Sequence, residues 1–272
     1  MACFSISTWS LHRQLGRAWY EATPGGFVNR SREEAQLRLL DVPSQIAKRG
    51  IGLLEICHFH FPSTDEGYLN ELKGELKRSD VRLFNVLIDA GDITHFDPVR
   101  RKADLNFIRG WIDVAAHCGA EHVRVIAGDA EDSDEAIGLS AEGLTAMAAY
   151  GRAQDVAVMT ENFKRLTSRA APLLEILNRC DGQVGLCTDF GNFKGETKYD
   201  DLAAVLPRAD SIHAKADYED GKMIQDAFTR CLDLAKDVMF NGPYTLIFQD
   251  PGDEWVYLDR LKKEIAPYLT RQ

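Results

Sequence analysis

The sequence predicts an α/β fold built as a single (β/α)8 barrel, the TIM barrel architecture. Eight short apolar runs alternate with helical stretches along the 272 residues, which is the pattern of parallel βαβ units. The length is close to the roughly 250 residues typical of one such barrel. Polar residues also stand at the ends of four successive runs, at Glu161, Asp189, His213 and Gln249. In a barrel, strand ends of this kind converge on one mouth.

Each expected strand is a short apolar run bounded by polar or turn residues. Gly50 and Gly52 precede the second run, and Gly128 and Asp129 follow the fourth, as turn residues do. In chain order the expected strands are Cys3–Ser7, Leu53–Cys57, Arg82–Leu87, His122–Ile126, Val156–Thr160, Val184–Cys187, Ser211–Ala214 and Tyr244–Phe248.

The stretches between these runs carry apolar residues at helical spacing, and Gly119 suits the position just after a helix. We expect a polar loop at Pro24–Arg30, and mouth loops or lids at Ala90–Val99 and Gly128–Ser140. The expected helices lie near Arg32–Arg49, Glu66–Arg78, Val99–Cys118, Ala141–Ala153, Arg169–Arg179, Met223–Met239 and Glu254–Tyr268.

The alternative fold is an open, doubly wound sheet. The segment after the first strand, Ser7–Leu11, contains no GxGxxG fingerprint, which argues against a dinucleotide-binding sheet. Composition does not change along the chain and no linker is visible, so we expect one domain over residues 1–272.

Composition narrows the class of protein. A net charge of −10 argues against binding to nucleic acid, which needs a basic face, although a local basic pocket for a phosphate remains open. No apolar stretch approaches the roughly 18 residues of a membrane span, and no signal segment is seen. The six cysteines form no CxxC pair. We therefore expect a cytoplasmic protein with reduced thiols, and leave open whether it forms a homo-oligomer.

The four strand-end residues together suggest a divalent metal site. Taken singly, each has a structural reading: a salt-bridged Glu161, Asp189 as a helix N-cap, His213 as a core histidine, and Gln249 as a polar strand end. The occurrence of all four at the ends of successive strand-like runs is much less expected by chance than any one of them alone. Oxygen ligands with one nitrogen favour Mn²⁺, Mg²⁺ or Co²⁺, and Zn²⁺ is also compatible.

The chain resembles the xylose isomerase-like TIM barrels, a family that includes sugar phosphate isomerases and ketose 3-epimerases. The resemblance covers most of the chain, including the passage Ala115–Val125, and is strongest from Glu161 to Asp253. Three segments match the family's motifs, which lie after strand five, after strand six and at strand seven: Thr160-Glu161-Asn162, Asp189-Phe190-Gly191-Asn192 and Ile212-His213-Ala214-Lys215.

This resemblance implies roles for particular residues. In the family, a Glu, an Asp, a His and a second Glu bind one divalent metal, and the two Glu residues move the proton beside a carbonyl. Glu161, Asp189 and His213 would inherit ligand roles, and Glu161 the role of base. The implied substrate is a small sugar or polyol-like hydroxycarbonyl compound.

Two positions depart from the family pattern. Gln249 falls on the second Glu, and an amide can ligate a metal but is no base at neutral pH. Phe163, Lys164 and Arg165 stand where many members have His and Gly-Gly. The two cations could bind a phosphate or carboxylate, or could be solvated loop charges. Further candidates for substrate contact are His58 and His60, which could instead be packing or surface residues, and Trp9, which could be plain core. Lys215 could bind a substrate oxygen or pair with a neighbouring carboxylate, and Asn162 is a further candidate.

The sequence leaves several functions open. The leading one is a metal-dependent isomerase or epimerase. A metal-dependent lyase or hydrolase is the second, because elimination needs no second base. A non-catalytic sugar-binding protein is the third, supported by Gln249. Zinc AP endonucleases of the same superfamily bind DNA and use more His ligands, and the charge of −10 argues against them.

Overall fold

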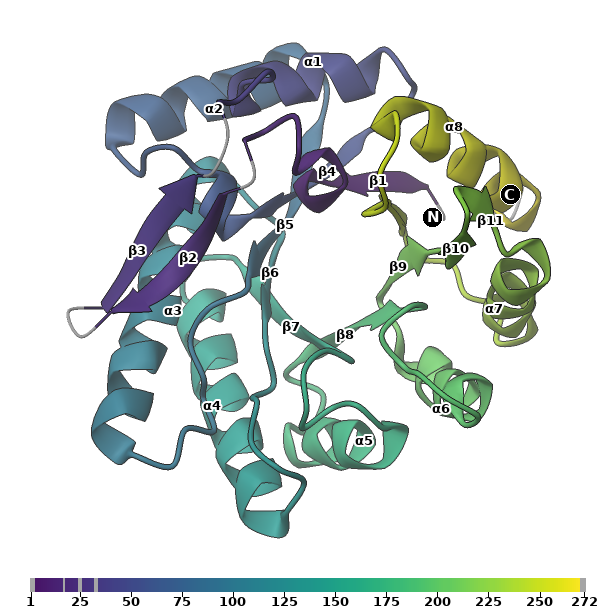
Figure 1. Ribbon diagram of the computed structural model, residues 1–272. Helices are drawn as coiled ribbons and strands as arrows, with labels where there is room; N and C mark the ends of the chain where they lie inside the picture. Colours follow the sequence, from purple (N-terminus) through teal and green to yellow (C-terminus); the bar gives the residue numbers. More distant parts are fainter. Residues whose placement is uncertain (1–2, 17, 24–25, 32–33, 270–272) are drawn as a thin grey trace.

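The computed structural model describes residues 3–16, 18–23, 26–31 and 34–269, and in this part of the chain eight parallel strands close into a barrel (Figure 1). The order around the barrel is β1-β12-β9-β8-β7-β6-β5-β4, and β4 pairs back to β1. The predicted (β/α)8 barrel is therefore confirmed, and the alternative of an open sheet is excluded. The barrel strands are β1 (Phe4–Ser7), β4 (Leu53–Cys57), β5 (Arg82–Ile88), β6 (His122–Val125), β7 (Ala157–Glu161), β8 (Gly185–Asp189), β9 (Ser211–Lys215) and β12 (Tyr244–Ile247).

The α-helices surround the barrel (Figure 1) and cover the apolar outer faces of the strands. None of the described helices is long and apolar enough to span a bilayer. The helices are α1 (Val42–Ala47), α2 (Glu66–Arg78), α3 (Pro98–Cys118), α4 (Asp134–Arg152), α5 (Ala170–Arg179), α6 (Lys198–Val205), α7 (Gln225–Asp237) and α8 (Glu254–Ile265).

The segment before β4 differs from the prediction. The helix expected at Arg32–Arg49 is limited to a 3₁₀ turn, η2 (Leu39–Asp41), and the short α1; residues 32 and 33 lie outside the described part. Pro43 stands in the first turn of α1, where its missing N–H leaves no helical bond unmade. The helix therefore begins beside the proline.

Two short hairpins were also missed. The expected polar loop at Pro24–Arg30 overlaps an antiparallel hairpin of β2 (Ala18–Thr23) and β3 (Gly26–Ser31), which is separate from the barrel sheet (Figure 1). Residues 24 and 25 lie outside the described part. A second hairpin, β10 (Tyr218–Glu219) with β11 (Lys222–Met223), follows β9. Glycines such as Gly25 and Gly26 occur both in polar loops and between the strands of hairpins, so composition alone does not distinguish the two.

Helix α4 begins seven residues before the expected start at Ala141, so the predicted mouth loop Gly128–Ser140 is shorter than expected. Ser133 caps the helix, with its Oγ accepting from the N–H of Ala136 at 3.1 Å. Two acidic residues fill the first turn, where the helix dipole favours negative charge. These polar residues resemble a loop by composition but are N-terminal helix residues. The loop after β5 extends to Asp97, the N-cap of α3.

The inside of the barrel is polar toward its C-terminal end and apolar beneath. Leu53, Met159 and Cys187 belong to a small apolar cluster separate from the main core. Each lies two residues before an inward polar residue of the same strand, so the apolar cluster forms a floor. The buried polar side chains contributed by the strands above and around this floor include Ser5, Ser7, Glu55, Asn85, Arg124, Glu161, Asp189, Ser211, His213 and Thr245.

Candidate metal centre

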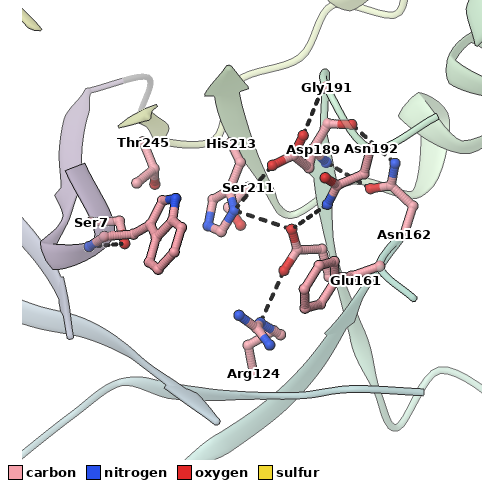
Figure 2. Close-up of polar contacts among 12 residues, drawn as sticks. Ser7, Arg124, Glu161, Asn162, Asp189, Gly191, Asn192, Ser211, His213 and Thr245 are labelled. Atoms are coloured by element: carbon pink, nitrogen blue, oxygen red, sulfur yellow. Dashed lines mark hydrogen bonds and ion pairs between the residues drawn. The ribbon is translucent and has the colours of Figure 1, made fainter. Parts of the chain in front are cut away.

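Three neighbouring strands bring Glu161, Asp189 and His213 together. Glu161 ends β7 and Asp189 ends β8, and the parallel register sets Asp189 opposite His213 of β9. All three residues are nearly inaccessible to solvent, and one ligand atom from each lies within 4.8 Å of the others. His213 Nδ1 is 3.3 Å from Glu161 Oε1 and 3.8 Å from Asp189 Oδ2 (Figure 2). This spacing would allow one ion to contact all three.

Residues of the two matching loop motifs hold these carboxylates in place (Figure 2). Asn162 accepts from the backbone N–H of Asp189 at 2.7 Å and donates to its carbonyl at 3.0 Å. The Gly191 N–H donates to Asp189 Oδ1 at 2.6 Å. Asn192 Nδ2 donates to Glu161 Oε1 at 3.1 Å. Asn162 therefore contacts the strand end of Asp189, and Asn192 contacts the Glu161 carboxylate directly.

Arg124 of β6 forms a buried ion pair with Glu161. Its Nε lies 2.9 Å from Glu161 Oε2, and its Nη2 lies 2.6 Å from Asp89 Oδ1. Burial would raise the pKa of Glu161, but the charges of Arg124 and His213 outweigh it and lower that pKa to about 2. Burial also raises the pKa of Asp189, against the attraction of Lys215. Glu161 is therefore an anion at neutral pH.

Glu55 of β4 occupies the other side of His213. The Nε2 of His213 lies 2.8 Å from Glu55 Oε2, and Thr245 Oγ1 donates to Glu55 Oε1 at 3.2 Å. Burial would lower the pKa of His213, but the neighbouring Cys187, Glu55 and Glu161 outweigh burial and hold it well above 6.5. In the absence of a metal, this imidazole is surrounded by groups that favour its charged form.

A cavity of about 150 Å³ opens beside the three residues at the C-terminal ends of the strands. A second cavity of about 480 Å³ adjoins it and shares Asp89 as a lining residue. The first cavity is lined by Ser7, Trp9, Cys57, Leu87, Asp89, Arg124, Glu161, Phe163, Asp189, Asn192, His213, Lys215, Ile247 and Gln249.

Glu161, Asp189 and His213 form the central cluster of the site. Three other residues that the sequence predicts as metal ligands or substrate contacts also line the first cavity. Trp9 and Lys215 are half-buried in its wall. Gln249 also lines it, but it follows the end of β12 and is exposed, and its backbone carbonyl accepts from Arg13 Nη1 at 3.1 Å. Gln249 thus faces the same space as the cluster from the rim.

The other expected substrate contacts lie elsewhere. His58 is buried against Trp111 and accepts from the N–H of Asp89. His60 is buried and hydrogen-bonds Thr8 at 2.8 Å. Both follow β4 in a 3₁₀ turn, η3 (His58–His60), which turns them away from the first cavity.

Lys164 and Arg165 are exposed. Lys164 lines the second cavity, and Arg165 pairs with Glu131 at 2.7 Å. Neither is among the residues that line the first cavity, so a phosphate group held by both cations would lie away from the central cluster.

The sequence assigned no role at the metal site to four residues, although Glu55 lies in the expected second strand just before the candidates His58 and His60. Glu55 and Arg124 lie on the inward face of their strands, and Asp89 directly follows β5. Asn192 lies in the segment Asp189–Asn192, in which the family resemblance implies a ligand role for Asp189 alone. Inward alternation of charged residues in otherwise apolar strands is the signal that could have identified Glu55 and Arg124.

The donor set fits a hard divalent ion. Glu161 Oε2 is buried and has no hydrogen-bond partner among the described residues, although it lies within ion-pair distance of Arg124. Two carboxylates and one imidazole nitrogen suit Mg²⁺, Mn²⁺ or Co²⁺. A carboxylate on the far nitrogen of a histidine is also the usual support of a histidine ligand.

Comparisons with known proteins agree with this architecture. Residues 43–258 match the model of the family described as xylose isomerase-like TIM barrel. A search among curated proteins found no significant match.

The structure is also similar to solved structures at low sequence identity, a likeness that concerns the fold. L-ribulose 3-epimerase shares 14% identity at a TM-score of 0.71, over 99% of this chain and 95% of that one. The probable 3-DHS dehydratase AsbF from Bacillus anthracis shares 14% identity at a TM-score of 0.70, over 99% and 100%. A xylose isomerase-like TIM barrel protein from Mycobacterium smegmatis, solved in complex with magnesium, shares 13% identity at a TM-score of 0.68, over 98% and 96%.

Proposed function

Because the chain belongs to the xylose isomerase-like TIM barrel family, we propose that it is a metal-dependent enzyme that isomerises or epimerises a small sugar-like hydroxycarbonyl compound. The observation that carries the proposal is the buried cluster of Glu161, Asp189 and His213 beside a cavity at the mouth of the barrel. Similar folds include L-ribulose 3-epimerase, whose activity motivates the reaction class.

Glu161 is the proposed base. Its carboxylate is ionised at neutral pH, so it is in the charge state that accepts a proton. Its low pKa makes it a weak base in the metal-free protein, so proton removal depends on an acidified substrate. A divalent ion held by Glu161, Asp189 and His213, with Gln249 or water completing its shell, would polarise the substrate carbonyl and a neighbouring hydroxyl.

The first cavity would hold the reacting part of the substrate. Its volume is about 150 Å³, but it is open and adjoins the second cavity of about 480 Å³, so the rest of a sugar-sized molecule would extend beyond it. Trp9 would wall one side of the reacting part of the molecule. The Lys215 ammonium would bind a substrate oxygen, since its side chain reaches the same cavity.

A second candidate reaction is dehydration. Gln249 lines the cavity, and the resemblance to the family places it at the position of a second Glu. An amide cannot return a proton to the far face of the reacting carbon. Elimination removes a proton from one carbon and a hydroxyl from its neighbour, which together leave as water, so it needs no second base on the opposite face of the reacting carbon. The similarity in fold to a probable 3-DHS dehydratase is consistent with this alternative.

Solvent-deuterium exchange tests both reactions. Metal-loaded protein would be incubated in D₂O with a panel of ketoses, their phosphates and hydroxy-ketoacids, with products read by NMR and mass spectrometry. We expect deuterium beside the carbonyl, abolished by chelation and by Glu161→Gln. Loss of one water would identify dehydration. Glu121→Gln, on a partly exposed pair with Arg82, is the matched control. Metal-loaded wild type that exchanges no substrate proton, or exchange that survives Glu161→Gln, would defeat the proposal.

A further inference from the structure

The geometry points to Glu55 as a positioning residue for the metal site. We propose that Glu55 holds His213 with the proton on Nε2, so that His213 binds the metal through Nδ1. This inference rests on the proposed function, because it concerns the same metal site. It assigns a role to a residue on the opposite wall of the barrel from the three candidate ligands.

Glu55 and His213 form a short contact that is buried from solvent. Glu55 is 0% exposed and His213 4% exposed, and Glu55 Oε2 lies 2.8 Å from His213 Nε2. The other ring nitrogen, Nδ1, faces Glu161 Oε1 at 3.3 Å and Asp189 Oδ2 at 3.8 Å. The two nitrogens therefore have different partners: one a carboxylate outside the cluster, the other the two candidate ligands.

A second donor fixes the Glu55 carboxylate. Thr245 Oγ1 donates to Glu55 Oε1 at 3.2 Å, and the strand register sets Thr245 directly beside His213. Both oxygens of Glu55 thus receive a hydrogen bond from neighbouring positions on β12 and β9. A buried carboxylate is costly unless it is paired, and these are the pairings found for Glu55 in the described part of the chain.

The choice of nitrogen matters because a neutral imidazole has one N–H and one lone pair. A carboxylate at Nε2 accepts a hydrogen bond and therefore keeps the proton there. The lone pair on Nδ1 then faces Glu161 and Asp189. The opposite tautomer would direct an N–H toward the ligand position and could not bind a metal there. Glu55 would thus act on metal affinity through His213, without touching the metal or substrate.

The first experiment identifies the ligating nitrogen in the unaltered protein. Protein with ¹⁵N-labelled histidines is loaded with Mg²⁺ or Zn²⁺, and two-bond ¹H–¹⁵N spectra are recorded. The His213 signals are assigned by their loss in His213→Asn. We expect a protonated Nε2 and a metal-shifted Nδ1. A metal-shifted Nε2 would overturn the inference alone, whereas wild type that binds no metal would defeat the proposed function with it.

The second experiment measures Mn²⁺ affinity by competition with a metal-sensitive dye. We expect Glu55→Gln to weaken binding by about 10–100-fold, the usual cost of altering an outer-shell partner. Thr245→Val should weaken it by less than tenfold, since it only frees the carboxylate. Asp104→Asn removes another buried carboxylate, one that pairs with Arg100 outside the site, and should leave Mn²⁺ affinity unchanged.

The outcomes are separable even if one variant folds poorly, which circular dichroism would reveal. If folded Glu55→Gln binds Mn²⁺ as tightly as wild type, Glu55 does not position His213. If Asp104→Asn weakens binding as much as Glu55→Gln does, the loss reflects general destabilisation and the inference fails. If Glu55→Gln does not fold, the ligating nitrogen seen in the wild-type spectrum still decides the question.

Discussion

Arg124 and Glu161 form an ion pair inside the barrel, with Arg124 Nε 2.9 Å from Glu161 Oε2 and both side chains 4% exposed. The same guanidinium lies 2.6 Å from Asp89 Oδ1, so one cation joins the ends of β5 and β7 (Figure 2 shows its contact with Glu161). This arrangement fixes Glu161 as an anion and also determines how the site responds to mutation and to pH.

Replacing Arg124 should destabilise the metal-free protein. Arg124→Met removes the guanidinium from Glu161 Oε2 and leaves the buried carboxylate with contacts to His213 and Asn192 at Oε1. Removing one partner of a buried ion pair typically costs about 3–5 kcal/mol. Arg82→Met is the matched control, because Arg82 pairs with Glu121 at 3.2 Å on the surface, where a pair contributes about 0–1 kcal/mol. Urea unfolding of both variants measures the difference. Similar losses in the two variants would contradict the structural importance of the buried pair.

Acid should destabilise the metal-free protein partly through Glu161. Its folded pKa of about 2 lies below its ordinary value of 4.5. A carboxylate with a lowered folded pKa stabilises the fold above the unfolded pKa, and this stabilisation is lost as the pH falls toward the folded pKa. We therefore expect wild type to lose stability between about pH 5 and pH 2, and Glu161→Gln to lack that part of the loss. The free energy of unfolding in urea is measured as a function of pH for both proteins. If it falls in parallel for wild type and Glu161→Gln, Glu161 is not a source of the acid sensitivity.

Metal binding should raise the stability of the wild-type protein and depend on Asp189. An ion that binds only the folded state adds about 2.7 kcal/mol at a free concentration 100 times its Kd. We expect Mn²⁺ to raise the Tm of wild type but not of Asp189→Asn. Asp113→Asn, at an exposed carboxylate that accepts from Tyr150, should respond as wild type does. Stoichiometric Mn²⁺ retained by Asp189→Asn would remove Asp189 from the ligand set.

Restoring a carboxylate at position 249 should favour epimerisation. A general acid–base group typically raises the reaction rate by about 10²–10⁴-fold. Gln249 lines the cavity, but its amide is not such a group. We expect Gln249→Glu to raise two-face proton exchange on ketoses tenfold or more, and Gln249→Met to leave it low. The rates are measured by deuterium incorporation in D₂O. Efficient wild-type epimerisation that Gln249→Glu does not improve would show that another residue supplies the second proton.

Local sequence patterns were sufficient to predict site residues that lie within a strand, because alternation along the strand determines the direction of each side chain. The strand ends of β7 and β8 and the middle of β9 could be located from apolar runs, so the meeting of Glu161, Asp189 and His213 could be anticipated. Such patterns were insufficient just beyond a strand. His58 and His60 follow β4 in η3, where alternation no longer applies, and both pack into the interior rather than lining the first cavity.

The sequence by itself determined the alternation of strands and helices and the polar residues Glu161, Asp189 and His213 on three successive strands, because strand and helix periodicities are local properties of the chain. Only the tertiary structure decided that Glu55 meets His213, 158 positions away in sequence, and that Arg124 pairs with both Asp89 and Glu161. These contacts depend on the closure of the barrel and on the register between strands. No local pattern encodes either, because both arise from the packing of the whole sheet.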